Sequence, residues 1–243
     1  MFKRNLSLTA QVKSHLKQRI LNAEFEDGRI PSEADLASEL NVGRSTIREA
    51  LGRLENESVI YRRQGSGTFV NETGLQIKTP LEEIWDYEKI LEAHGYTPST
   101  KILSVNEESV NSAIATDLNL DPEAPALVVQ KLFLADDNPV VLTRNYIPSA
   151  IITQPYTNDD FHLPMYEFLT RFGQQELLYY FSEIVPLAAP AWLVDKLSLS
   201  SQNKILLSFE ELGYNQDNEP IIKAYSYFRD DLLRLRLIRR PVK

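Results

Sequence analysis

Residues 31–51 read PSEADLASELNVGRSTIREAL, and this pattern predicts two short helices joined by a tight turn. Ser32 can accept a backbone N–H as the cap of the first helix. Residues 41–43 leave room only for a sharp turn. The second helix spaces its apolar residues i, i+3, i+4 and i+7, which is the interval of one buried face. Those apolar residues are Ile47, Ala50, Leu51 and Leu54.

The polar residues at the start of the second helix then point away from its buried face. They are Arg44, Ser45, Thr46 and Arg48. In a helix-turn-helix the N-terminal residues of the second helix meet base edges, and an arginine can pair with guanine through two hydrogen bonds. A solvated helix face is the alternative for the two arginines. Glu33 could stabilise the helix dipole, orient a partner or contact DNA.

A basic hairpin follows, since residues 59–70 read VIYRRQGSGTFV. Gly65 and Gly67 provide the tight turn, and Arg62 and Arg63 lie just before it. A wing of this kind can lie along a groove and meet phosphates. A helix over residues 8–22 precedes the unit, with Val12, Leu16 and Ile20 on its buried face.

The chain has 243 residues, enough for two domains with separate cores. It contains no cysteine, which excludes disulfides and thiolate metal sites and suits a reducing cytoplasm. No apolar run approaches the roughly 20 residues of a membrane span. We therefore expect a cytoplasmic protein with no membrane partner. The net charge is −8, yet residues 1–70 hold 11 basic and 9 acidic side chains, so the acidity belongs to the second part.

Three segments together resemble the winged helix-turn-helix of the GntR family of bacterial transcription regulators. They are residues 30–37, 42–51 and 63–70, in that order. The resemblance implies a homodimer on a palindromic double-stranded operator. It also implies a DNA-contacting set, which we take as Ser32, Arg44, Ser45, Thr46, Arg48, Arg63, Gly65 and Gly67.

We expect an α+β protein with a winged helix-turn-helix domain over 1–71, a linker over 72–80 and a larger domain over 81–243. A helix is predicted over 81–94, and another over 107–118. Two copies of a hairpin pattern follow, turning at Asp137-Asn138-Pro139 and at Asp217-Asn218-Glu219-Pro220. Each copy has a tyrosine seven residues after its proline. Two such hairpins predict one antiparallel sheet with helices on one side.

The second domain resembles the UTRA effector-binding domain of the HutC subgroup, which is similar in fold to chorismate lyase. The resemblance rests on the order of four markers: the turn at 137–139, residues 146–148, a helix over 166–173, and Arg229-Asp230 after the last strand. It implies a small-molecule effector.

In that subgroup, a Ser/Thr-rich segment and basic strand residues hold the phosphate of sugar phosphates. The matching positions here are residues 85–88, Lys131, Phe133 and Thr143, and only Lys131 keeps the expected character. Asp86 and Glu88 would repel a phosphate, so a neutral, partly apolar or cationic effector fits better. The aromatic residues could equally be core. Our candidate effector residues are Trp85, Asp86, Tyr87, Lys131, Phe133, Thr143, Ile222 and Arg229.

No catalytic, metal-binding or cofactor-binding pattern emerges, because the three histidines lie in separate segments and no phosphate loop is present. The prediction is a transcription regulator, by class a repressor, whose operator affinity responds to an effector. A DNA-binding protein whose second domain only dimerises is the alternative. An enzyme of lyase-like fold is a further one, although fold alone carries no activity.

Overall fold

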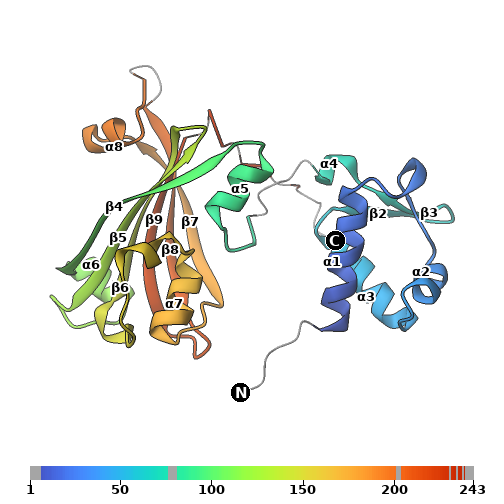
Figure 1. Cartoon of the computed structure of the whole chain (residues 1–243), viewed down its shortest axis with the longest axis horizontal. Coiled ribbons are helices and arrows are strands. Elements are labelled where there is room, and N and C mark those ends of the chain that lie inside the picture. Colours follow the sequence, from blue (N-terminus) through green and yellow to red (C-terminus); the bar gives the residue numbers. More distant parts are fainter. Residues whose placement is uncertain are drawn as a thin grey trace. The chain divides into compact units, whose positions relative to one another are not determined.

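The computed structural model describes residues 7–75, 81–200, 204–229, 231–233, 235, 236 and 238. The chain divides into two compact units, one formed by 1–80 with 236–243 and the other by 81–235 (Figure 1). The division follows the change in charge and pattern along the sequence. The predicted boundaries at 71 and 80 remain predictions.

The first unit contains the predicted helix-turn-helix and wing. Its helices are α1 (Leu8–Leu21), α2 (Glu33–Glu39) and α3 (Arg44–Asn56). The wing strands are β2 (Ile60–Arg63) and β3 (Gly67–Val70), paired antiparallel as expected. A two-residue strand, β1 (Arg29–Ile30), adds to the other side of β3 and was not expected from the sequence.

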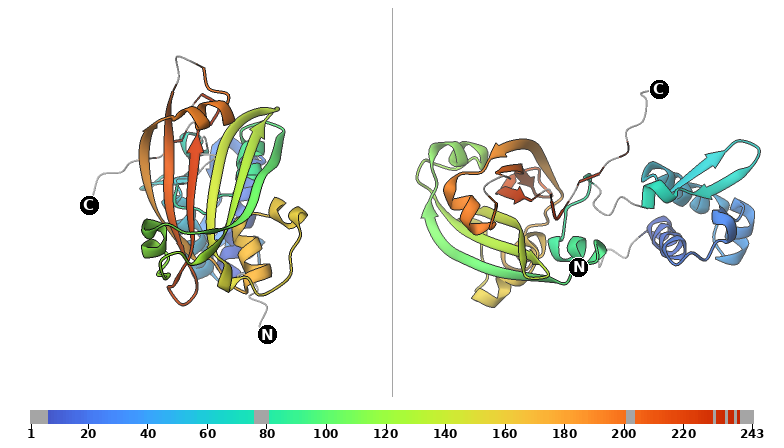
Figure 2. Two further views of the ribbon diagram at one scale, coloured as in Figure 1. Left: turned by 90° about the vertical axis from the view of Figure 1, so that its left-hand side faces the viewer. Right: turned by 90° about the horizontal axis from the view of Figure 1, so that it is seen from above.

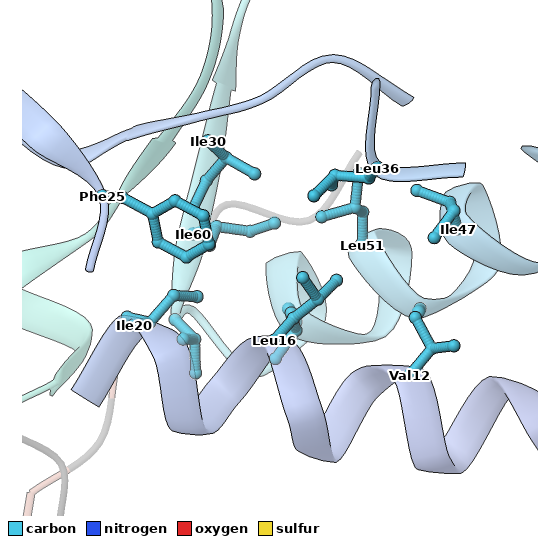
Figure 3. Close-up of a cluster of buried hydrophobic side chains, with 12 residues drawn as sticks. Val12, Leu16, Ile20, Phe25, Ile30, Leu36, Ile47, Leu51 and Ile60 are labelled. Atoms are coloured by element: carbon cyan, nitrogen blue, oxygen red, sulfur yellow. The ribbon is translucent and has the colours of Figure 1, made fainter. Parts of the chain in front are cut away.

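One apolar core holds these elements together, as Figure 3 shows. The apolar face of α1 packs with those of α2 and α3, and the wing contributes through its first strand. Fully burying one such aliphatic side chain stabilises a fold by roughly 1.5–3 kcal/mol. The labelled members of the cluster are Val12, Leu16, Ile20, Phe25, Ile30, Leu36, Ile47, Leu51 and Ile60.

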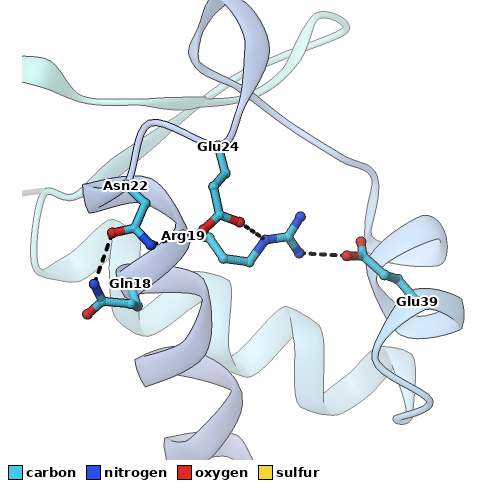
Figure 4. A network of polar contacts seen from close by, with 5 residues as sticks. All are labelled: Gln18, Arg19, Asn22, Glu24 and Glu39. Atoms are coloured by element: carbon cyan, nitrogen blue, oxygen red, sulfur yellow. Dashed lines mark hydrogen bonds and ion pairs between the residues drawn. The ribbon is translucent and has the colours of Figure 1, made fainter.

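Arg19 links α1 to α2 at the surface of this core (Figure 4). Its Nη1 lies 2.8 Å from Glu39 Oε1, and its Nε lies 3.2 Å from Glu24 Oε2. The guanidinium also lies over the Phe25 ring, 4.8 Å from its centroid. Because both carboxylates are exposed, each ion pair contributes less than about 1 kcal/mol. The network therefore adds little to the stability of this unit.

The first residues of the predicted linker are helical. Residues Glu72–Leu75 form α4, which packs against the end of the wing unit. A Cβ on Gly74 would lie 1.7 Å from the Ser58 carbonyl oxygen, so only glycine permits this approach. The rest of the predicted linker, 76–80, lies outside the described residues.

The second unit is built on a six-stranded antiparallel sheet of order β4-β5-β6-β9-β8-β7 (Figure 2). The two predicted hairpins are present and meet through β6 and β9 at its centre. The strands are β4 (Pro98–Ser109), β5 (Pro125–Ala135), β6 (Asn138–Pro148), β7 (Tyr179–Ala188), β8 (Ile205–Tyr214) and β9 (Pro220–Phe228).

The helices of this unit are shorter than predicted. The helix expected over 81–94 is α5 (Tyr87–Ala93), because the Asp86 side chain caps it by accepting from the backbone N–H groups of Glu88 and Lys89. The helix expected over 107–118 is α6 (Ser112–Asp117), since β4 extends to Ser109. The others are α7 (Met165–Gly173) and α8 (Ala191–Lys196), with 3-10 turns η2 (Ser149–Ile151) and η3 (Asn158–His162).

Helices cover both faces of the sheet, so the expectation of helices on one side was wrong. Alternate β5 residues point to opposite faces. On one face Val129 packs in a cluster with Phe168 of α7, and Phe133 packs in a cluster with Leu91 of α5. On the other face Leu132 and Leu134 share a cluster with residues of α8. Both faces of β5 are apolar, and each must be covered to exclude water. This is the physical reason why helices lie on both sides of the sheet.

Candidate functional site

The start of α3 presents the predicted base-reading residues. Gly43 is the N-cap and offers no side chain to the free backbone N–H groups. Arg44, Ser45 and Arg48 are exposed, and Thr46 is half-buried. On the opposite side of the helix, the apolar residues lie in the core, so the helix is held rigidly while its polar end stays accessible.

Glu33 connects the helix-turn-helix to the wing. Its Oε2 accepts hydrogen bonds from Arg48 Nε at 3.0 Å and Arg48 Nη2 at 2.9 Å. These bonds and the charge of Glu33 raise the pKa of Arg48. Arg62 Nη2 on β2 lies 3.8 Å from the other oxygen, Oε1. Glu33 is also in the first turn of α2, so the structure agrees both with the stabilisation of the helix dipole and with the orientation of partners.

Ser32 is committed to a local cap. Its Oγ accepts from the backbone N–H of Asp35 at 3.2 Å and donates to Asp35 Oδ2 at 2.6 Å. The backbone N–H of Ser32 donates in return to Asp35 Oδ2 at 3.3 Å, which completes a capping box that fixes the start of α2. Ser32 is exposed, but its hydroxyl is already hydrogen-bonded to Asp35. A contact between this hydroxyl and DNA would therefore compete with the cap.

The wing tip has the backbone conformation that its glycines allow. Gly65 has φ of 74° and Gly67 has φ of 116°, a region that other residues rarely adopt. Arg63 is exposed, and its guanidinium lies 5.7 Å from the centroid of the Phe69 ring. The tip is therefore narrow and carries a cation at its base.

A cavity of about 400 Å³ opens on one face of the sheet in the second unit. It gathers residues from α5, the segment before it, η3, α7 and five strands. Six of the eight predicted effector residues line it: Trp85, Asp86, Tyr87, Lys131, Phe133 and Thr143.

Two rows of side chains across the sheet form the floor of this cavity. The pairing register aligns Lys131, Thr143, Ser226 and Phe209 in one row. It aligns Asn145, Ala224, Glu211 and Ser182 in the next. All eight line the cavity. Residues paired across neighbouring strands point to the same face, which is why strands far apart in sequence contribute to one surface.

Lys131 is the one lysine or arginine on the described wall, and it is already engaged. Its side chain is 2% exposed, and Nζ donates to the Leu163 carbonyl oxygen at 2.6 Å. Burial lowers the pKa of Lys131 to about 8, against the opposing influence of Glu88 and Asp86. The Lys131 ammonium is therefore committed to a structural hydrogen bond and is poorly placed to bind an anionic ligand.

Aromatic rings form a wall that is both core and cavity lining. Trp85 lies 5.3 Å from Phe209 between ring centroids, and Tyr87 lies 4.9 Å from Phe133. Tyr87 is half-buried and donates its hydroxyl to Ser226 Oγ at 2.9 Å, and the burial of that hydroxyl raises its pKa. The two readings of these aromatics from sequence are therefore compatible, because each ring packs on one side and faces the cavity on the other.

Two predicted effector residues are not on this wall. Ile222 is fully buried in the core beside Gly213. Arg229 donates to the carbonyl oxygens of Pro139 and Leu197 at 3.1 Å and 3.2 Å. It also pairs with Asp231 at 2.7 Å. Both residues support the sheet and its neighbouring loops.

Sequence reasoning missed Asn145 and Glu211, which do line the cavity. Asn145 stands two residues after Thr143, so the two-residue period of a strand could have identified it. Glu211 has no such local signal, because it reaches the cavity only through the pairing of β8 with β9.

The described part of the chain has neither a candidate membrane span nor a candidate metal site. No helix there combines the length and apolar character that crossing a bilayer requires. No group of three or more His, Cys, Asp or Glu side chains there has an arrangement that could hold a metal ion.

Comparison with known proteins assigns both units. Residues 8–70 match the family of bacterial regulatory proteins named gntR, and residues 93–234 match the UTRA domain. The chain is 24% identical over 222 residues to the transcriptional repressor NagR of Bacillus subtilis, covering 91% of this chain and 90% of that one. It is 30% identical over 206 residues to the histidine utilization repressor of Pseudomonas putida, covering 84% and 77%.

A solved structure has the same fold. The possible transcriptional regulator YydK from Bacillus subtilis aligns over 96% of this chain and 99% of that one, with a TM-score of 0.76 and 14% identity. The winged unit implies DNA binding, and the UTRA domain implies a small-molecule effector. The chain belongs to the GntR family of bacterial transcription regulators, in the HutC subgroup that joins a winged helix-turn-helix to a UTRA effector domain.

Proposed function

We propose that this regulator is a repressor that binds a palindromic operator as a homodimer and is released when an effector occupies the cavity on its sheet. Two features together support the proposal: an exposed basic helix end in one unit and a cavity on the sheet of the other. Both relatives described above are named as repressors, which supports the direction of control.

Arg44, Thr46 and Arg48 are the residues proposed to read bases, with Ser45 beside them. They occupy the first two turns of α3, where a recognition helix meets base edges. Arg63 and the backbone at Gly65 and Gly67 would meet phosphates from the wing, which adds affinity without sequence information.

A second copy of the chain is proposed to pair along β7. This strand ends the described sheet, so one side of its backbone has no strand beside it. Phe181 and Ile184, which point to opposite faces of this edge strand, are 63% and 49% exposed. A two-fold axis would bring the same patch of both copies together, as closed dimers require. Two recognition helices must then stand roughly 34 Å apart to read successive major grooves.

The effector is proposed to act through the segment before α5. Residues 81–86 line the cavity and directly follow 76–80, which join the two units in sequence. A ligand that contacts this segment favours one of its arrangements. The affinity of the dimer for DNA then changes by the factor by which the ligand prefers the state that does not bind DNA over the state that does.

The experiment uses full-length protein and a DNA site selected from a randomised library. Arg44→Ala and Arg48→Ala should each lower the preference for that site over scrambled DNA about tenfold, because a lost bidentate contact relaxes discrimination. Arg53→Ala is the matched control, since Arg53 lies in the last turn of the same helix, paired with Glu49.

Unchanged preference in both variants would remove the base-reading assignment. A small-molecule extract of the source cells should release the DNA, and release should fail when the extract is replaced by buffer. A monomer on the selected site by sedimentation would contradict the dimer.

A further inference from the structure

The described wall of the cavity is strongly acidic. It carries five carboxylates, of Glu82, Glu83, Asp86, Glu88 and Glu211, against the single ammonium of Lys131. Three of these carboxylates have a partner in the protein: Asp86 pairs with Lys89 at 2.9 Å, Glu88 accepts from Thr100, and Glu211 accepts from Ser182. The potential inside the cavity therefore favours a positive ligand over a negative one.

Glu211 is the carboxylate on the floor. It lies on β8 beside Ala224 of β9 and Ser182 of β7. Ser182 Oγ donates to Oε1 at 2.7 Å, and no other described residue donates to this carboxylate. Burial raises the pKa of Glu211, and no lysine or arginine of the described residues forms an ion pair with it.

Asn145 presents a second acceptor in the same row. Its side chain is 4% exposed, and Nδ2 donates to Thr143 Oγ1 at 3.3 Å. Its Oδ1 receives no hydrogen bond from the described residues, although the residue lines the cavity. An acceptor on the cavity wall that takes no hydrogen bond from the described residues is open to an N–H donor of a bound molecule.

Ala224 separates these two acceptors. The register pairs it with Asn145 on one side and with Glu211 on the other. Neighbouring strands lie about 4.8 Å apart, so the backbones of Asn145 and Glu211 are about 10 Å apart across the small alanine. A compact group with several N–H donors fits this gap and can donate to Asn145 and Glu211 at the same time.

We propose that the cavity binds a small organic cation with N–H donors, held over Ala224 between Glu211 and Asn145. The rest of the ligand lies against the aromatic wall of Trp85, Tyr87 and Phe209. Aromatic faces attract cations and accept apolar carbon, so one wall serves both parts of such a ligand. The inference rests on the proposed function of this cavity as the effector site.

The test measures binding of three probes of matched shape to the full chain by calorimetry. They are 2-phenylethylammonium, neutral 2-phenylethanol and anionic phenylacetate, with glucose 6-phosphate as a phosphate probe. The ammonium should bind at least about tenfold more tightly than the others, as expected for a desolvated charge-assisted contact.

Three variants locate the contact. Glu211→Gln keeps the shape and should abolish the preference for the ammonium, whereas Glu211→Asp keeps the charge and should retain part of it. Glu210→Gln is the matched control. The Glu210 carboxylate is next to Glu211 in sequence but does not line the cavity, so this variant should leave all affinities unchanged. Thermal unfolding of each variant establishes that it is folded before binding is measured.

Tighter binding of glucose 6-phosphate or phenylacetate, or an undiminished ammonium preference in Glu211→Gln, overturns the proposed ligand class. So does the absence of binding by the ammonium at 10 mM, a level chosen as roughly ten times a weak millimolar dissociation constant. The effector function is judged separately, by whether a cell extract releases the full chain from its selected DNA. If the extract releases the DNA but the ammonium does not bind, the proposed ligand class is wrong and the proposed effector function stands.

Discussion

Glu33 holds Arg48 through three hydrogen bonds: Arg48 Nε and Nη2 donate to Oε2 at 3.0 Å and 2.9 Å, and Nε also donates to Oε1 at 3.3 Å. The first turn of α2 thereby aims a side chain of α3. The guanidinium is ordered before any DNA arrives, so less side-chain entropy is lost on binding.

Replacing Glu33 with glutamine should therefore weaken discrimination rather than attraction. Glu33→Gln removes a negative charge beside the DNA-facing surface, so affinity for scrambled DNA should rise at low salt. The ratio of affinities for the selected site and scrambled DNA should fall at least about threefold, part of the value of a bidentate contact. Anisotropy titrations at two salt concentrations measure both. An unchanged ratio would show that Glu33 does not position Arg48 for reading.

Two glycines of the first unit should respond to alanine in opposite directions. A Cβ on Gly74 meets the Ser58 carbonyl oxygen at 1.7 Å, which requires the backbone to shift. Gly74→Ala should lower the free energy of unfolding by about 1–3 kcal/mol. Gly52 lies inside α3, and a Cβ added there would have nothing within 4 Å, so Gly52→Ala should raise that free energy by about 0.5–1 kcal/mol. Urea unfolding followed at the first unit measures both, and equal signs would contradict the packing of α4.

Gly213 and Ser208, both on β8, form a similar pair. A Cβ on Gly213 would lie 2.5 Å from Ile222 Cγ2 and 2.8 Å from Tyr180 Cε1, so Gly213→Ala should destabilise the second unit by about 1–3 kcal/mol. The buried Ser208 Oγ has no hydrogen-bond partner among the described residues, so Ser208→Ala should be neutral or stabilising by about 1 kcal/mol. Denaturant midpoints at constant slope test the pair. A destabilised Ser208→Ala would show that its hydroxyl has a partner in solution.

Lys131 should make the stability of the second unit depend on alkaline pH. Its pKa in the fold is lowered from 10.5 to about 8, so the unfolded chain binds more protons between those values. The free energy of unfolding then rises with pH across that window, by up to about 3 kcal/mol. Lys131→Met lacks this contribution and should gain most over the natural chain below pH 8. Urea unfolding at pH 7.5 and pH 10 provides the comparison, and parallel changes in both proteins would contradict it.

Local patterns predicted the winged unit well because its determinants are close in sequence. Ser32 caps the helix that begins at the next residue, and Gly65 and Gly67 shape a turn of a few residues. The same holds for the hairpins β5–β6 and β8–β9. The helix over 81–94 was overestimated because Asp86 competes for the free N–H groups of Glu88 and Lys89 and thereby starts the helix later.

The cavity, in contrast, depends on contacts between residues that are far apart in the sequence. The residue types on its floor can be read along the chain, but Asn145, Ala224 and Glu211 meet only because β6, β9 and β8 pair in one register. A shift of one residue would turn each of these side chains to the opposite face. The sequence by itself thus established the DNA-reading unit, the hairpins and the family, all of which rest on short-range order. The acidic, aromatic cavity came from long-range strand pairing, which places Glu211 on its floor and Ile222 in the core.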